Sequence, residues 1–141
     1  MASPFRLMRP IISQAAKPRA VAFASRPFHS SAARLAVRDI KTTAEFKELV
    51  STTDKAVLVD CFATWCGPCK AISPILSKLS DQPDLQSVEF VKFDVDELPD
   101  LAAALGIRAM PTFIVFKDGK NVDEMVGANP PMLEKLVRKH A

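Results

Sequence analysis

The sequence contains little of what several classes of protein depend on. Its 141 residues include three cysteines, four glycines, one tryptophan and no tyrosine. Three cysteines form at most one disulfide, which excludes a scaffold held by several bridges, and four glycines exclude a collagen-like chain. The longest stretches without a charged residue, 61–69 and 125–133, are nine residues long, whereas a membrane-spanning helix needs about 20 apolar residues. We therefore expect no segment to cross a membrane, and the 48% hydrophobic content indicates one globular domain.

Acidic residues are absent from the first 38 positions, although that segment contains seven basic residues, five serines and four prolines. An arginine-rich, serine-containing and acid-free N-terminus is typical of an organelle transit peptide. Within it, Arg26, Phe28 and Ser31 resemble the motif of mitochondrial two-step processing. By that resemblance, residues 1–35 are a cleaved mitochondrial transit peptide. A basic tail that stays attached is the alternative.

Cleavage changes the charge of the protein. Six of the 19 basic residues lie in residues 1–35, so residues 36–141 carry 13 basic and 16 acidic residues and a net charge of −3. The basic character of the whole chain therefore gives no support to nucleic-acid binding. We expect neither nucleic acid nor membrane as a partner.

Residues 36–141 alternate between helical and strand patterns. Thr42 and Glu45 form a capping box at the start of a first helix. Ala56–Phe62 is a continuous β-prone run, which suits a central strand buried on both faces. The further expected elements are a helix with its buried stripe over 72–79, a strand over 88–95, a short helix over 98–105, a hairpin of 112–116 and 121–126 turning at Asp118-Gly119, and a helix after Asn129. This order predicts an α/β fold, with a central mixed β-sheet flanked by helices on both faces.

The hexapeptide WCGPCK at residues 65–70 follows the central strand directly, where α/β proteins usually place their chemistry. Two cysteines three residues apart on the first turn of a helix lie on one face and are close enough to bridge. Cys66 at the helix start faces free N–H groups and the positive end of the helix dipole, which lower the pKa of its thiol. Cys69, one turn in, is expected to be less exposed. The pattern predicts Cys66 as the nucleophile and Cys69 as the resolving thiol.

Two structural roles for this cysteine pair are disfavoured. A zinc site needs four ligands, and beyond the pair the chain offers only Cys61, His29 and His140. A purely structural disulfide across so short a loop removes little entropy from the unfolded chain.

Cys61 alternates with Asp60 along the strand, so we expect a small buried hydrophobe on the opposite sheet face, with a regulatory thiol as the alternative.

The stretch Val57–Lys70 (VLVDCFATWCGPCK) resembles the thioredoxin family, and the resemblance extends over essentially all of residues 36–141. The further matches are Asp60, Pro74, Lys92, Met110-Pro111-Thr112, Phe116–Gly119 and Gly127. With the transit segment ahead of it, the chain resembles the mitochondrial members of the family. It departs from the family pattern at Cys61 and Phe62, where two aromatic residues are usual, often Phe and then Trp.

The resemblance implies roles for residues near the cysteine pair. Asp60, in an apolar strand where desolvation raises its pKa, is the expected proton acceptor for Cys69. Lys92 is expected to lie beside Asp60 and to tune it. A solvated aspartate and a solvated surface lysine are the alternatives. Gly67 and Pro68 resemble the pair found in reductants, since disulfide-forming and isomerising relatives commonly carry Gly-His there.

The resemblance also implies a substrate-binding rim around Cys66. Pro111 resembles the family's cis-proline facing the disulfide, and Met110 before it would offer its backbone to an extended substrate. Small residues in such a rim let a partner's backbone come close. The expected flat, apolar rim consists of Trp65, Gly67, Pro68, Met110 and Gly127. For Gly127, an ordinary strand end is the alternative.

These residues and the resemblance together predict a protein disulfide reductase that cycles Cys66 and Cys69 between dithiol and disulfide. The resemblance implies that the chain binds no cofactor itself and receives electrons from NADPH through a flavoprotein, thioredoxin reductase. It implies disulfide-containing partners such as peroxiredoxins and a part in cell redox homeostasis. No metal is expected, because the chain offers too few ligands, and we expect a monomer in the mitochondrial matrix, a reducing compartment. The two rival hypotheses are an oxidase or isomerase of the same fold, and a binding module whose thiols are incidental.

Overall fold

The structure, a computed structural model, describes residues 37–141. The expected transit peptide, with Arg26, Phe28 and Ser31, lies outside the described residues. The elements in chain order are β1 (Arg38–Asp39), α1 (Thr43–Thr52), β2 (Ala56–Phe62), α2 (Gly67–Ser80), the 3-10 helix η1 (Pro83–Leu85), β3 (Val88–Asp94), α3 (Pro99–Ala104), β4 (Thr112–Lys117), β5 (Lys120–Val126) and α4 (Pro130–His140). Within this part of the chain, no helix is long and apolar enough to span a membrane.

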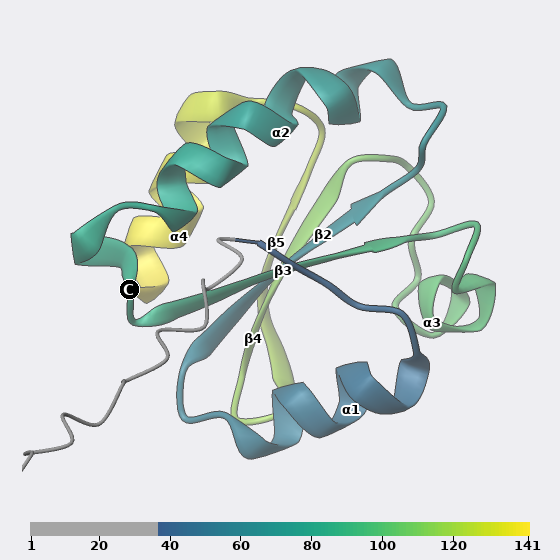
Figure 1. The fold of residues 1–141 in the computed structure, drawn as a ribbon, viewed down its shortest axis with the longest axis horizontal. Helices are drawn as coiled ribbons and strands as arrows, with labels where there is room; N and C mark the ends of the chain where they lie inside the picture. The colour runs from purple at the N-terminus through teal and green to yellow at the C-terminus, as the bar shows by residue number, and fades with distance from the viewer. Residues whose placement is uncertain (1–36) are drawn as a thin grey trace, which may run out of the picture. The chain divides into compact units, whose positions relative to one another are not determined.

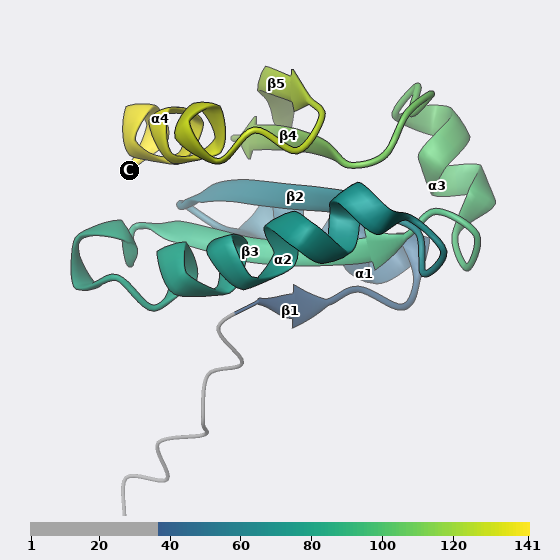
Figure 2. The same cartoon turned by 90° about the horizontal axis from the view of Figure 1, so that it is seen from above.

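A five-stranded mixed sheet forms the centre of this part of the chain, with strand order β1-β3-β2-β4-β5. Strands β1, β3 and β2 run parallel, whereas β4 pairs antiparallel with β2 and β5 antiparallel with β4. Figure 1 shows α2 and α4 on one face of the sheet and α1 and α3 on the other, and Figure 2 shows the strands in order from β5 to β1. The predicted α/β fold with helices on both faces is confirmed, and β2 is its central strand.

Alternate side chains of β2 divide the hydrophobic core in two. Leu58 packs with Leu76 of α2 and Leu133 of α4. Val59 and Cys61 pack on the other face, with side chains of α1 and α3. Each of these β2 side chains is 1% exposed or less, so the strand is buried on both faces as predicted. The position between Val59 and Cys61 therefore faces α2.

Most element boundaries follow local signals. Thr42 is the N-cap of α1, and its Oγ1 accepts a hydrogen bond from the Glu45 N–H at 3.1 Å. The Glu45 carboxylate reaches back to accept from the Lys41 N–H, also at 3.1 Å, one residue earlier than in the usual capping box. In the β4–β5 turn, Asp118 and Gly119 have φ of 51° and 72°. Positive φ at both positions marks the hairpin turn predicted from the Asp-Gly pair.

Two short elements were not predicted from the sequence. Strand β1 is two residues long and pairs with β3, and the Ile40 N–H donates to the Lys92 carbonyl at 2.8 Å just after it. The 3-10 helix η1 forms between α2 and β3. The observed strand boundaries differ from the predicted ones by one residue: β3 ends at Asp94 rather than at residue 95, and β5 begins at Lys120 rather than at residue 121.

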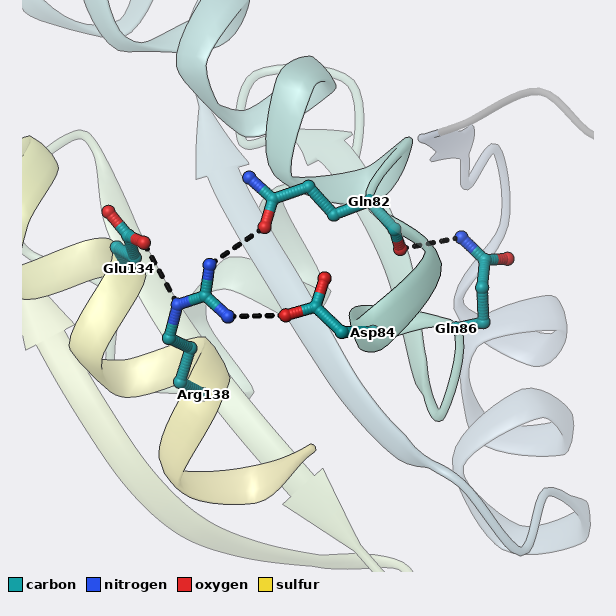
Figure 3. Close-up of polar contacts among 5 residues, drawn as sticks. All are labelled: Gln82, Asp84, Gln86, Glu134 and Arg138. Carbon is teal, nitrogen blue, oxygen red and sulfur yellow. Dashed lines mark hydrogen bonds and ion pairs between the residues drawn. The ribbon is translucent and has the colours of Figure 1, made fainter.

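The last turns of α4 are tied to the η1 segment by Arg138 (Figure 3). Its guanidinium donates to the Asp84 carboxylate, to Gln82 Oε1 at 2.8 Å and to Glu134 Oε1 at 2.9 Å. Gln86 Nε2 donates to the Gln82 carbonyl at 3.1 Å in the same group. Because the Arg138 side chain is 43% exposed, water screens these charges. The network therefore orients the end of α4, while the buried side chains of that helix provide most of its stability.

Thr42→Ala is expected to lower the free energy of unfolding by about 1 kcal/mol. The substitution removes the oxygen that accepts the Glu45 N–H, so a backbone donor at the start of α1 loses its partner. Urea unfolding of the variant and of the parent chain measures the loss. Thr43→Ala is the matched control, because Thr43 lies inside the helix and is not its cap. Equal losses in the two variants would contradict the prediction.

Candidate active site

The cysteine pair lies at the junction of β2 and α2. Cys66 is the N-cap of α2, and its Sγ accepts a hydrogen bond from the Cys69 N–H at 3.2 Å. Pro68 lies in the first turn, where a missing N–H has no carbonyl partner to lose. Cys66 and Cys69 form a disulfide with Cα atoms 5.4 Å apart, which confirms the predicted bridge. Once the bridge is reduced, the helix N-terminus favours the thiolate form of Cys66.

Cys66 is more covered than the sequence suggests. Cys66 and Cys69 are both 4% exposed in this disulfide form, so the prediction that Cys69 is the less exposed of the two is wrong for this state. The cause is a segment far along the chain, since the Cys66 Sγ lies 3.7 Å from the Met110 carbonyl oxygen. The Met110 side chain also packs against the small buried cluster of Ala63, Cys66 and Cys69. Tertiary contact thus covers a sulfur that local pattern places at an open helix end.

The loop before β4 meets the disulfide at a cis peptide bond. The bond between Met110 and Pro111 is cis, as the resemblance implied. On one side of the loop, the Thr112 hydroxyl donates to the Ala109 carbonyl at 2.7 Å. On the other, the Gly127 N–H donates to the Pro111 carbonyl at 2.8 Å. These bonds hold the loop in place beside the sulfur atoms.

The expected rim residues come from three separate segments. Trp65, Gly67 and Pro68 are exposed at the start of α2. Met110 and Gly127 are half-buried, and they reach this place through the contacts of the cis-peptide loop. Met110 therefore lies beside Cys66 and Gly127 beside Pro111, while the flat, apolar rim and its use in binding an extended substrate stay predictions.

Sequence reasoning missed the residue that orients Trp65. The indole Nε1 donates to Asp96 Oδ2 at 2.8 Å. The Asp96 N–H in turn donates to Asp94 Oδ1 at 2.8 Å. The segment after β3 thus fixes the direction of an otherwise exposed ring. No local signal marks this pair, because 31 residues separate the two partners.

A cleft of about 450 Å³ lies behind the disulfide, between β2, β3 and α2. Its lining includes Asp60, Lys92 and Cys69. By the resemblance, Asp60 accepts the proton of Cys69, and Lys92 tunes Asp60. The remaining walls come from Phe62, Ala63, Thr64, Lys70, Ser73 and Pro74. Asp60 and Lys92 are direct partners in the β2–β3 register, which confirms that Lys92 lies beside Asp60.

The Asp60 carboxyl is buried without full hydrogen bonding. Asp60 is 4% exposed, and its Oδ1 has no hydrogen-bond partner among residues 37–141. Burial raises the pKa of the Asp60 carboxyl from 3.8 to about 7, and the positive charge of Lys92 opposes part of this effect. A carboxyl with such a pKa can take up and release a proton at neutral pH. Because it lines the same cleft as Cys69, this carboxyl is a candidate acceptor for the thiol proton.

Cys61 lies outside this chemistry. It is 0% exposed and packs on the sheet face opposite the cleft, as predicted. Burial raises the pKa of its thiol, and the charges of Asp60 and Glu124 raise it further. Because the thiolate is the reactive form of cysteine, this position favours the small buried hydrophobe over the regulatory thiol.

Residues 37–141 contain no group of three or more His, Cys, Asp or Glu side chains placed to hold a metal ion. His140, considered above as a zinc ligand, instead has its Nε2 at 3.0 Å from Asp123 Oδ2.

Gly127→Ala is expected to lower the free energy of unfolding by about 1–2 kcal/mol, because Gly127 has φ of 98°, a conformation that residues with a Cβ avoid. No atom lies within 4 Å of the added Cβ, so the loss comes from the backbone. Gly67→Ala is the matched control at the same rim, since its Cβ also meets nothing within 4 Å and Gly67 begins a helix. Urea unfolding that shows an equal loss for both variants would contradict the prediction.

Comparison with known proteins gives one family. The thioredoxin family model matches residues 37–139. The chain is 53% identical over 104 residues to Thioredoxin Asp f 29 of Aspergillus fumigatus, and the match covers 74% of this chain and 94% of that protein. It is 42% identical over 127 residues to Thioredoxin-3, mitochondrial, of Saccharomyces cerevisiae, with 79% of this chain and 97% of the relative covered.

Solved structures give the same result. The Malassezia sympodialis thioredoxin Mala s 13 superposes with a TM-score of 0.70 at 46% identity, over 74% of this chain and 90% of that one. A chain from a structural study of the thiol resolving mechanism in yeast mitochondrial 1-Cys peroxiredoxin via glutathione/thioredoxin systems superposes with a TM-score of 0.68 at 40% identity, over 73% and 94% of the two chains. The family model, which matches residues 37–139, and the superposed structures therefore both point to the thioredoxin family.

Proposed function

Because this chain belongs to the thioredoxin family of protein disulfide oxidoreductases, we propose that it works in the reducing direction on disulfides of partner proteins. The observation that carries this proposal is the Cys66–Cys69 pair at the N-terminus of α2, beside the cis peptide before Pro111. Gly67 and Pro68 between the cysteines support the reducing direction, since the family's oxidising and isomerising members commonly carry Gly-His there.

The cycle begins with the Cys66 thiolate, which attacks one sulfur of the partner's disulfide. A mixed disulfide forms, and the other partner sulfur leaves as a thiolate. Cys69 then gives its proton to the Asp60 carboxylate, which lines the same cleft. The Cys69 thiolate attacks the Cys66 sulfur and breaks the mixed disulfide, so the second partner sulfur also leaves as a thiolate. The proton on Asp60 returns to a partner thiolate or to water, and water supplies any further proton that the partner's dithiol needs. Two electrons have moved to the partner, and the Cys66–Cys69 bridge has formed.

Regeneration needs an external donor of two electrons. In the proposed scheme a flavoprotein, thioredoxin reductase, passes electrons from NADPH to the bridge, so this chain itself binds no cofactor. Peroxiredoxins are proposed partners, and the similar chain solved in work on yeast mitochondrial 1-Cys peroxiredoxin supports that choice. The protein is proposed to act as a monomer, because one chain contributes both sulfur atoms and the carboxyl.

The mitochondrial matrix is the proposed location, with residues 1–35 as the transit peptide and residues 36–141 as the mature thioredoxin domain. The composition of the first 35 residues and the similarity to a mitochondrial yeast thioredoxin support this proposal. A fluorescent protein fused behind residues 1–35 should enter mitochondria, and its N-terminal sequencing should find the cut after Leu35. Cytosolic fluorescence would overturn the proposal.

Insulin-disulfide reduction by the purified full chain tests the reductase proposal. With thioredoxin reductase and NADPH, insulin should precipitate as its chains separate, and omission of the reductase should stop turnover after one equivalent. A reduction potential well above that of the glutathione couple would instead favour an oxidase or isomerase. Full biological activity of a Cys66→Ser, Cys69→Ser double variant would favour the binding module.

A further inference from the structure

Lys92 is paired with an aromatic ring, although a carboxyl lies beside it. Its Nζ lies over the ring of Phe62, 5.3 Å from the ring centroid. Within residues 37–141, no ion pair shorter than 4.0 Å joins Lys92 to any acidic side chain, and the neighbouring Asp60 keeps Oδ1 without a partner. The ammonium group is therefore held by the ring face, an attraction between a cation and the negative face of the ring.

The sheet register explains why these three residues meet. Lys92 of β3 is the direct partner of Asp60 in β2, and Phe62 follows Asp60 by two residues on the same face of β2. All three line the cleft behind the disulfide. The flexible lysine stem starts opposite the carboxyl and is directed along the strand, toward the ring at its end. Two positions are thus available to the ammonium group, one over Phe62 and one against Asp60.

Few other charges face Asp60. From α2, the titratable or charged side chains that line the cleft are Cys69 and Lys70, and from β3 the only one is Lys92. From β4, the register partner of Asp60 is the apolar Phe113. The position of the Lys92 ammonium is therefore the main electrostatic variable for the carboxyl.

We propose that Phe62 is a positioning residue, whose ring holds the Lys92 ammonium away from Asp60 and so keeps the buried carboxyl unpaired. This inference rests on the proposed role of Asp60 as acceptor of the Cys69 proton, and it deepens that role. A carboxylate in an ion pair holds a proton less firmly than an unpaired buried one. The ring thereby preserves the affinity for protons that the resolving step needs at neutral pH.

Substitutions at residue 62 can keep or remove the ring that holds the Lys92 ammonium. The family often has Trp where this chain has Phe62, and an indole is the stronger partner for a cation. Phe62→Trp should therefore retain the contact, whereas Phe62→Leu removes the ring face and keeps an apolar side chain of similar volume. In Phe62→Leu, Lys92 is free to turn to the Asp60 carboxylate.

The test follows the Asp60 carboxyl carbon by NMR across pH, in the oxidised full chain. Phe62→Leu should move the titration midpoint toward acid by about one pH unit, and Phe62→Trp should leave it near that of the parent. In a Lys92→Met background, Phe62→Leu should have no such effect, because the cation that the ring holds is gone. Phe62→Met offers a second loss of the ring if the leucine variant does not fold.

Three results would overturn the proposal: an unchanged midpoint in Phe62→Leu, a midpoint moved toward alkaline pH, or an equal shift with and without Lys92. The pH profile of insulin reduction should move in parallel with the midpoint. Because the NMR titration uses oxidised protein and no partner, it stands apart from reductase activity. Failure of the reductase proposal and failure of this inference are thus distinguishable.

Discussion

Cys69→Ser is expected to leave partner proteins covalently attached to Cys66. Cys66 can still attack a partner's disulfide. The Cys69 sulfur, which forms the bridge to Cys66 in the parent, is absent, so nothing resolves the mixed disulfide and it persists. Steady-state insulin reduction should fall by on the order of 10³-fold. Non-reducing electrophoresis of mitochondrial extracts mixed with the variant should reveal adducts that a dithiol reagent dissolves.

Two further variants control the trapping experiment. Cys66→Ser lacks the attacking sulfur and should form no adduct. Cys61→Ser should retain reductase activity, because that side chain is 0% exposed and packs on the far face of the sheet. Adducts of equal amount in Cys66→Ser and Cys69→Ser would contradict the assignment of the two sulfur atoms.

Asp60→Asn is expected to stabilise the protein at alkaline pH and to slow its turnover. Burial favours the protonated carboxyl in the folded protein and raises its pKa from 3.8 to about 7. The stability that the protonated group contributes is fully present below about pH 4 and is lost as pH rises through about 7. At about 1.4 kcal/mol per pKa unit, the difference between the pKa of 3.8 and the folded-state pKa of about 7 corresponds to a loss on the order of 4 kcal/mol in the free energy of unfolding. Asparagine stays neutral, so it avoids this loss.

Urea unfolding at acid and alkaline pH measures the effect. The variant should match the parent near pH 4 and exceed its free energy of unfolding above about pH 8. Asp94→Asn is the matched control, because Asp94 is also 4% exposed but its Oδ1 accepts a hydrogen bond from the Asp96 N–H, so no gain is expected. Insulin reduction by Asp60→Asn should slow by roughly 10²-fold at neutral pH, the size of a lost general base. A variant no more stable than the parent at pH 8 would contradict the prediction.

Residues whose role is set by local pattern were predictable. The β2 run, the Thr42 cap, the Asp118-Gly119 turn and the cysteine pair at a helix start each follow from a few neighbouring residues. Strand β1 was not predictable, because its two residues carry no pattern and exist as a strand only by pairing with β3.

The rest of the site depends on side chains that meet across the fold. The sequence predicts that Asp60 and Lys92 lie side by side in neighbouring strands. It does not predict that the Lys92 side chain turns toward the Phe62 ring. Likewise it gives no sign that Asp96 accepts from Trp65. The resemblance placed Met110 in the rim around Cys66, but not its carbonyl oxygen 3.7 Å from the Cys66 Sγ. Such contacts depend on register, loop path and rotamer together, which no short window of residues contains.

Trp65 also makes the protein its own optical probe. It is the only tryptophan, the chain has no tyrosine, and its ring is 66% exposed next to the disulfide with its N–H held by Asp96. Ultraviolet emission excited at the indole band therefore comes from one fixed ring beside the reactive sulfur. Reduction of the bridge and the arrival of a partner should each change the brightness of that ring, so both steps can be timed by stopped-flow without an added dye.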